Sequence, residues 1–462
     1  MKSIDRKWWV LIAIGTGTFM SALDASVVNT VLPLIRDAFK SNVANIEWVV
    51  TIYLLLVSGL LLTFGRLGDL RGHKSVYVWG FAIFVLSSAL CGLASSALLL
   101  ISFRAIQAFG AAMLSSNSPA ILTGNFPDSQ RGQALGLSAT MTYLGLTVGP
   151  SLGGWLAQQF SWRAVFYINV PVGALALVLS LYFIPRDKPA EQSKKFDLAG
   201  AATFMTGLTA LLLGLNKGHD WGWNSPLVLG LLLVAALMLW LFLRIEHSSD
   251  SPMLDLSLFR SQTFSVTTAS AVLNYICVYT ILFLMPFYLI QGRSLSPATA
   301  GLLLTVQPIV MAIIAPVSGT LSDRIGTRIP TVLGMGLLGL GMFLLSRLGS
   351  HSPYTLAALG LGITGLGTGT YISPNNSALM GAAPRHRQGI ASGILASARS
   401  VGMVLGVGLA GAIFTTKLAS NPEAGLFNGT SLGFQITALI ALLAGLISLF
   451  QKDLQKLKSP SI

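Results

Sequence analysis

Charged side chains are scarce in this sequence. Only 10% of its 462 residues are Asp, Glu, Lys or Arg, whereas 53% are hydrophobic, and the mean hydropathy is +0.72. A soluble domain carries far more charge on its surface, so these values exclude an ordinary soluble protein. They indicate an all-α polytopic membrane protein instead.

Residues that build disulfides, metal centres and nucleotide sites are also few. The two cysteines, Cys91 and Cys277, both fall in apolar stretches, which argues against a disulfide framework. The five histidines fall in expected loops, no cluster has metal-ligand spacing, and no P-loop occurs. We therefore expect no cofactor, no bound metal, no ATP-driven step and no enzymatic activity.

Long apolar runs are what the chain has in abundance. Crossing the hydrocarbon core takes about 20 mostly apolar residues in a helix. On this basis the sequence predicts fourteen transmembrane helices, at 9–35, 46–65, 75–96, 98–124, 132–158, 162–185, 197–216, 226–244, 262–291, 297–321, 328–346, 353–381, 388–416 and 432–451.

The placement of Lys and Arg tests this count. If both termini are cytoplasmic, 20 of the 29 basic residues fall on the cytoplasmic side and seven on the outer side. This asymmetry follows the positive-inside rule and predicts a multi-pass protein of a bacterial plasma or inner membrane. Contact with anionic membrane lipid also explains the net charge of +13, so we expect no nucleic-acid partner.

Three charged residues fall deep within the predicted spans: Asp24, Arg104 and Arg399. A charge at that depth costs about 2.5 kcal/mol or more, so it normally faces the bundle interior or a water-filled cavity. Burial favours the neutral form of a carboxyl group, which would let Asp24 load and unload a proton. The alternative is an Asp that only joins neighbouring helices. Arg104 can tune such a carboxyl group, and Arg399 either binds backbone carbonyls or lines a cavity.

Internal repeats predict the architecture. The stretch "GRLGDLRGHK" at 65–74 returns as "GTLSDRIGTR" at 319–328. We therefore expect two six-helix bundles, at 1–185 and 262–462, with a linker and two extra helices at 186–261 and a short cytoplasmic tail.

Parallel repeats of this kind place a substrate cavity at their interface, near the membrane midplane. The candidates to line it are polar, aromatic or basic side chains at that depth, although each could instead hold helices together. They are Asn29, Tyr53, Gln107, Asn117, Asn274, Tyr275, Tyr279, Gln307, Tyr371, Asn375, Asn376 and Arg399.

Two glycine-containing motifs have a local physical interpretation. In 65–74 the glycines permit a tight turn, Asp69 can accept hydrogen bonds from a helix N-terminus, and the basic residues hold the loop at the lipid surface. In 145–154 the glycines form a smooth strip for a neighbouring helix, and Pro150 lets the helix bend. Charge that only sets topology, and close packing without a gating role, are the alternatives.

These motifs together resemble the major facilitator superfamily over essentially the whole chain, and within it the fourteen-helix drug:proton antiporters. The similar stretches are "LDASVVNTVLP" (23–33), "GRLGDLRGHK" (65–74), "RAIQAFGAAM" (104–113), "GLTVGPSLGG" (145–154) and "ARSVGMVLG" (398–406). One departure is Ala108, where the helix 4 motif usually has Gly.

The resemblance implies roles for particular residues. It implies that Arg104 takes part in proton coupling with Asp24. It implies a cytoplasmic conformational latch, formed by Gly65, Arg66, Asp69, Arg71, Gly72 and Lys74 with Asp323 and Arg324. It also implies an antiporter motif that favours exchange over uptake, formed by Gly145, Gly149, Pro150, Gly153 and Gly154.

The leading hypothesis is a proton-coupled antiporter that works by alternating access, functions as a monomer and exports lipophilic, neutral to monocationic small molecules. A dedicated exporter of one endogenous metabolite or lipid, including an anionic one, would share every motif. A membrane-embedded enzyme or sensor is the third possibility, but no nucleophile with a base falls at membrane depth.

Overall fold

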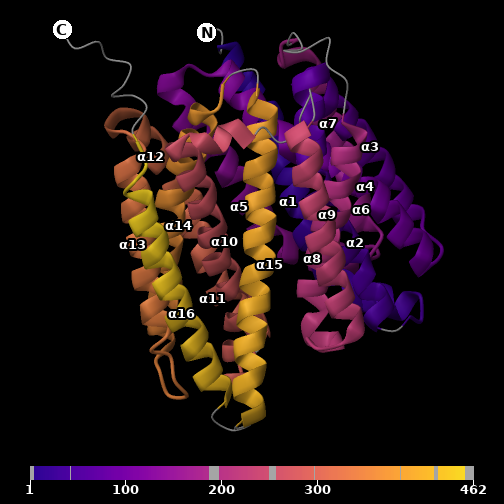
Figure 1. The fold of residues 1–462 in the computed structure, drawn as a ribbon. Helices are drawn as coiled ribbons and strands as arrows, with labels where there is room; N and C mark the ends of the chain where they lie inside the picture. Colours follow the sequence, from indigo (N-terminus) through magenta and orange to yellow (C-terminus); the bar gives the residue numbers. More distant parts are fainter. Residues whose placement is uncertain are drawn as a thin grey trace. The chain divides into compact units, whose positions relative to one another are not determined.

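Helices make up the regular secondary structure of the described chain. The computed structural model describes residues 5–41, 43–186, 197–248, 256–295, 297–384, 387–420 and 425–452 (Figure 1). Parts of the predicted linker at 186–261 lie outside these residues.

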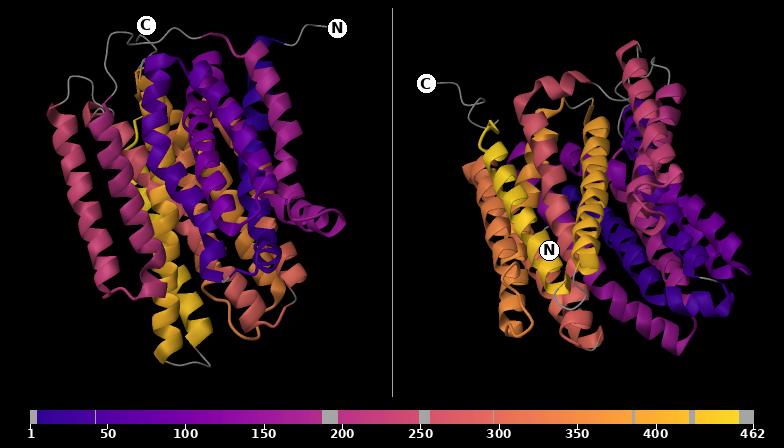
Figure 2. Two further views of the ribbon diagram at one scale, coloured as in Figure 1. Left: turned by 90° about the vertical axis from the view of Figure 1, so that its right-hand side faces the viewer. Right: turned by 60° about the horizontal axis from the view of Figure 1, so that its bottom comes forward.

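The first helices are long and separated by short connections. They are α1 (Arg6–Ala38), α2 (Val43–Arg71), α3 (His73–Leu93), α4 (Ala97–Asn125), η1 (Asp128–Gln130), α5 (Arg131–Gln159), α6 (Ala164–Tyr167) and α7 (Asn169–Phe183). A helical pair follows, α8 (Leu198–Trp221) and α9 (Pro226–Ser248), whose members run side by side with the Phe204 and Phe242 ring centroids 5.1 Å apart (Figure 2).

The second half is also helical. Its elements are η2 (Leu256–Arg260), α10 (Gln262–Pro286), the π-helix η3 (Phe287–Gly292), α11 (Pro297–Leu304), α12 (Val306–Ile325), α13 (Arg328–Leu345), α14 (Tyr354–Ala382), α15 (Gln388–Ser420) and α16 (Gly425–Ser448).

The chain divides into two units, each with its own packing. Unit 1 comprises residues 1–209, 237–255 and 383–397, and unit 2 comprises residues 210–236, 256–382 and 398–462. In unit 1, α1 packs on α5 and α7, and α4 packs on α2 and α3. In unit 2, α14 packs on α12 and α13, and α16 packs on α10 and α13. The first turns of α15, residues 388–397, therefore belong to unit 1.

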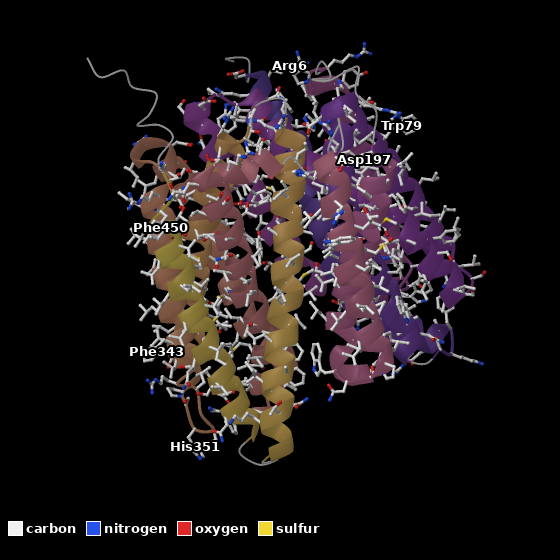
Figure 3. All side chains as sticks on the ribbon, in the orientation of Figure 1. Arg6, Trp79, Asp197, Phe343, His351 and Phe450 are labelled. Atoms are coloured by element: carbon white, nitrogen blue, oxygen red, sulfur yellow. The ribbon has the colours of Figure 1, made fainter. Side chains whose placement is uncertain are left out.

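Large apolar side chains are exposed on both units. Trp79 is 65% exposed in unit 1, and Phe343 and Phe450 are exposed in unit 2 (Figure 3). A surface of this kind is typical of contact with lipid. Thirteen helical segments of the described residues are long and apolar enough to cross a membrane. The one predicted span that is not among these thirteen is 132–158. It coincides with α5, which is rich in glycine, serine and threonine. This is a multi-pass membrane protein.

Prolines interrupt two of the predicted spans. The span at 162–185 breaks at Ile168, and the span at 297–321 breaks at Thr305. Pro171 and Pro308 stand in the first turn of the helix that follows each break. Proline fits there because it has no N–H to donate to the preceding turn.

The turn between α2 and α3 is shorter than the expected loop. We expected the helix to end at 65, but α2 continues to Arg71 and α3 begins at His73. Gly72 alone makes this turn, with φ 91, and Gly326, also with φ 91, begins the two-residue turn between α12 and α13. Glycine adopts this left-handed conformation without the steric cost of a Cβ.

Candidate functional site

A buried ion pair joins α1 to α4 inside unit 1. The Arg104 Nη1 donates to Asp24 Oδ2 over 2.7 Å, and each residue is only 1% exposed. Asp24 and Arg104, two of the charged residues that the sequence places deep in predicted spans, are therefore in direct contact. Arg104 thus compensates the charge of Asp24.

Two amide side chains complete the surroundings of the carboxylate. Asn169 Nδ2 donates to Asp24 Oδ1 over 2.7 Å, and Gln107 Nε2 donates to the same oxygen over 3.3 Å. Gln107 also donates to Ser88 Oγ over 2.5 Å and accepts from Arg104 Nη1 over 2.6 Å. With Arg104 included, three donors converge on the carboxylate of Asp24.

The guanidinium of Arg104 is held from several sides. Its Nε donates to the carbonyl of Val49 over 3.2 Å, and its Cζ lies 4.0 Å from the centroid of the Tyr53 ring. Phe166 lies on another side, with its ring centroid 5.9 Å from Cζ. The pair is thus buried among side chains of α2, α4 and α6, where either charge alone would be costly.

Two of the predicted cavity residues of unit 1 lie elsewhere. Asn29 is exposed, and its Nδ2 donates to Ala25 of its own helix over 3.0 Å. Asn117 is buried, and its Nδ2 donates to the carbonyls of Phe64 and Met113. Among the predicted cavity residues, only Tyr53 and Gln107 join the Asp24 and Arg104 pair.

The Asp69 carboxylate caps the N-terminus of α15. It accepts from the backbone N–H of Gly389 over 2.8 Å and from that of Ile390 over 2.9 Å, and all three residues belong to unit 1. The first N–H groups of a helix have no intrahelical partner, so a carboxylate there satisfies them and meets the positive end of the helix dipole. The expectation that Asp69 accepts from a helix N-terminus is confirmed.

Glycines bring the two backbones close enough for this contact. A Cβ at Gly65 would collide with the carbonyl of Gly389, and a Cβ at Gly389 would collide with that of Gly65. The idea that Gly65 helps to form a turn is therefore wrong, because it lies inside α2 and allows close approach instead.

The basic residues of the motif do not all face lipid. Arg71 is exposed, but Arg66 is only 2% exposed. Lys74 Nζ donates to the carbonyls of Leu181 and Ile184, over 2.7 and 2.6 Å, and so caps the C-terminal end of α7. The expectation that all three hold a loop at the lipid surface is wrong for Arg66 and Lys74.

His73 begins α3 rather than lying in a loop. Its Nε2 is 3.4 Å from Asp69 Oδ1, and its Nδ1 is 2.8 Å from Asn117 Oδ1. Of the counterparts in unit 2, Asp323 is half-buried and Arg324 is exposed.

The glycines of α5 face α1. A Cβ at Gly145 would meet Phe19 and Leu23, one at Gly149 would collide with Ser26, and one at Gly153 would meet Val27. The helix runs on through Pro150, and the space beside Gly154 is open. Three of the four glycines therefore form the expected strip, and Gly154 does not.

The predicted cavity residues of unit 2 fall into two groups. Asn274, Gln307, Tyr371 and Asn375 are buried, whereas Tyr275, Tyr279, Asn376 and Arg399 are half-buried. The Nδ2 of Asn274 donates to the Sδ of Met335, and the Nδ2 of Asn375 donates to the carbonyl of Thr267. Both are hydrogen bonds between helices.

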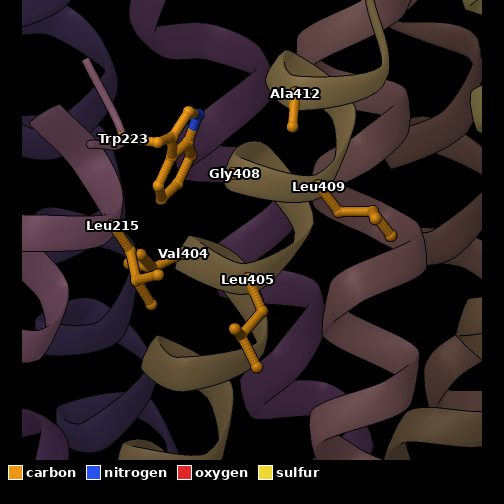
Figure 4. Close-up of a pocket in the computed structure, with 7 residues that line it drawn as sticks. All are labelled: Leu215, Trp223, Val404, Leu405, Gly408, Leu409 and Ala412. Carbon is orange, nitrogen blue, oxygen red and sulfur yellow. The ribbon is translucent and has the colours of Figure 1, made fainter. Parts of the chain in front are cut away.

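Unit 2 also contains an apolar pocket of about 430 Å³ between α15, the end of α8 and Trp223 in the turn that follows α8 (Figure 4). It includes none of the predicted cavity residues. Its lining residues are Leu215, Trp223, Val404, Leu405, Gly408, Leu409 and Ala412.

Comparison with known proteins places the chain in a family. The model of the Major Facilitator Superfamily matches residues 14–247 and 267–461. The chain belongs to the Major Facilitator Superfamily. It is thus a transporter and not an enzyme, and its cargo is a small molecule.

Individual relatives differ in what they carry. The chain is 37% identical to the riboflavin transporter RibZ of Clostridioides difficile over 91% of each chain. It is 34% identical to the multidrug resistance protein Stp of Mycobacterium tuberculosis, over 89% of this chain and 77% of the relative. In fold it is similar to the human organic anion transporter MFSD10, with a TM-score of 0.68 at 17% identity over 96% of this chain and all of the other.

Sequence reasoning missed two members of the Asp24 surroundings, Asn169 and Ser88. Asn169 follows the same rule as the other candidates, since it is an amide inside a predicted span. Ser88 gave no signal, because serine in an apolar helix commonly bonds to its own backbone.

Proposed function

We propose that this transporter is a proton-coupled antiporter that exports lipophilic, neutral to monocationic small molecules by alternating access. The observation that carries the proposal is the buried contact between Asp24 and Arg104. Similarity to a multidrug resistance protein supports the class of cargo.

The ion pair couples proton uptake to movement. When Asp24 gains a proton, Arg104 loses its counter-charge, and a buried charge without its partner costs about 3–5 kcal/mol. The guanidinium must then move or find another acceptor. Protonation at one side of the membrane therefore favours a different conformation, from which the proton leaves at the other side.

The contact of Asp69 with α15 supplies an element that can hold one conformation. We propose that it is the latch of the transport cycle on the cytoplasmic side, with both termini on that side. In this proposal the two six-helix halves rearrange about a midplane cavity, and the exchange of one proton for one monocation is electroneutral.

A dedicated exporter of a single metabolite is the second candidate. The relative named as a riboflavin transporter supports it. The half-buried cation of Arg399 in α15 also suits an anionic compound.

Transport in liposomes tests both candidates. The full chain is reconstituted, a pH gradient is imposed, and gradient-driven movement is followed for a panel of fluorescent lipophilic cations and neutral compounds and for riboflavin. Asp24→Asn should abolish concentrative movement. Asp37→Asn is the matched control, because Asp37 is on the same helix with its side chain 65% exposed.

The outcomes separate the candidates. Movement of many compounds supports multidrug export, and movement of riboflavin alone supports the dedicated exporter. Full concentrative transport by Asp24→Asn would refute proton coupling through this residue.

A further inference from the structure

Only one of the two polar atoms in the Asn169 side chain has a hydrogen-bond partner among the described residues. It is the first residue of α7, directly after the break at Ile168, and it is 1% exposed. Its Nδ2 donates to Asp24 Oδ1 over 2.7 Å, whereas its Oδ1 is buried and has no hydrogen-bond partner among the described residues. A buried amide oxygen is normally paired, so this one calls for a physical reason.

Gln107, the other amide beside Asp24, cannot change its orientation in the same way. Its Oε1 accepts from Arg104 and its Nε2 donates to Ser88. A half-turn would place the amide nitrogen against the guanidinium, donor against donor. Among the described residues, the side chain of Asn169 bonds to Asp24 alone, so the same half-turn breaks one bond and can form another.

The other described side chains beside the carboxylate are already engaged or face other groups. Arg104 stays charged and donates only. Tyr53 presents its ring to Arg104, and Cys91 Sγ lies 4.0 Å from Gln107 Oε1. Of the described side chains that hydrogen-bond to Asp24, Asn169 is the one with a buried acceptor atom that has no partner.

We propose that Asn169 is a positioning residue whose side-chain amide serves both forms of Asp24. Its Nδ2 donates to the carboxylate, and after a half-turn its Oδ1 accepts the O–H of the protonated carboxyl group. The inference rests on the proposed function, in which Asp24 takes up a proton. That proton becomes the O–H of the carboxyl group, and no other covalent bond forms or breaks.

Infrared difference spectroscopy tests the switch. Spectra of the full-length protein in liposomes are recorded between alkaline and acidic pH, and Asp24→Asn identifies the carbonyl band of protonated Asp24. Asn169→Ala removes both donor and acceptor, whereas Asn169→Ser keeps a hydroxyl group that can serve as either. Asn29→Ala is the control, because Asn29 lies on the helix of Asp24 but is exposed.

In Asn169→Ala the Asp24 band should move to higher frequency, because its O–H no longer donates to the amide. The pH of half-protonation should rise by about one unit, a tenfold change in proton affinity, because the ionised form loses the stronger of the two bonds. Asn169→Ser should restore both values toward those of the unaltered protein, and Asn29→Ala should change neither. An Asp24 band at the same frequency in Asn169→Ala would overturn the switch and leave Asn169 a fixed donor.

A second measurement avoids changing Asn169. With ¹³C-labelled asparagine in the unaltered sequence, the difference spectrum should contain an asparagine carbonyl band that Asp24→Asn abolishes. Its absence would overturn the inference. If these bands respond as expected while Asp24→Asn still transports fully, only the proposed function fails. If Asp24 does not titrate, both fail.

Discussion

Replacing Asp69 by asparagine tests the contact between α2 and the N-terminus of α15. Each carboxylate oxygen accepts one N–H, from Gly389 and from Ile390. Asparagine keeps one acceptor oxygen, and its NH₂ group cannot accept the other bond.

The size of the effect follows from these bonds. A hydrogen bond to a charged group contributes about 1.5–3 kcal/mol. The attraction of the charge to the helix N-terminus contributes up to about 2 kcal/mol in a partly buried geometry. Because Asp69 is 2% exposed, solvent screens these interactions little. Since the two contributions overlap, we expect a loss of about 3 kcal/mol, roughly 100-fold in the opening equilibrium.

Hydrogen exchange measured by mass spectrometry reads this equilibrium directly. In the full-length protein, the amides of Gly389 and Ile390 should exchange roughly 100-fold faster in Asp69→Asn, because both donate to the Asp69 carboxylate. Asp323→Asn, the same change at the repeated position in unit 2, should leave exchange over 388–397 unaltered. Unchanged exchange at Gly389 and Ile390 in Asp69→Asn would refute the assigned contact.

Two further predictions concern packing and the ion pair. Gly149→Ala should lower the midpoint of thermal unfolding in detergent, because overpacking against Ser26 costs about 1–3 kcal/mol. Gly154→Ala should leave the midpoint unchanged, because the space beside Gly154 is open. Equal midpoints for the two variants would contradict the packing of α5 on α1. Arg104→Lys should lower gradient-driven transport at least tenfold, because a lysine cannot supply the forked donors that reach Asp24 and Val49 together. If Arg104→Lys transports at an unaltered initial rate in liposomes, a positive charge alone is enough at this position.

The contacts of the Asp24 surroundings show where sequence reasoning reached its limit. Asp24 and Arg104 stand out because charges are rare in apolar helices, so their importance follows from composition alone. Their pairing could not be read from the sequence, because the two residues are 80 positions apart and their distance depends on how α1 and α4 pack. Asn169 was found only in the structure, where the break at Ile168 brings the first residue of α7 to the carboxylate.

The sequence by itself determined that this is a multi-pass helical membrane protein and where most of its helices lie, because the hydrophobic effect acts on each run of residues separately. It also identified Asp69 as a carboxylate suited to a helix N-terminus. Only the tertiary structure decided which helix that is, which glycines touch a neighbour, and that the buried acid is paired. Those properties depend on distances between segments remote in sequence, and such distances are set by packing.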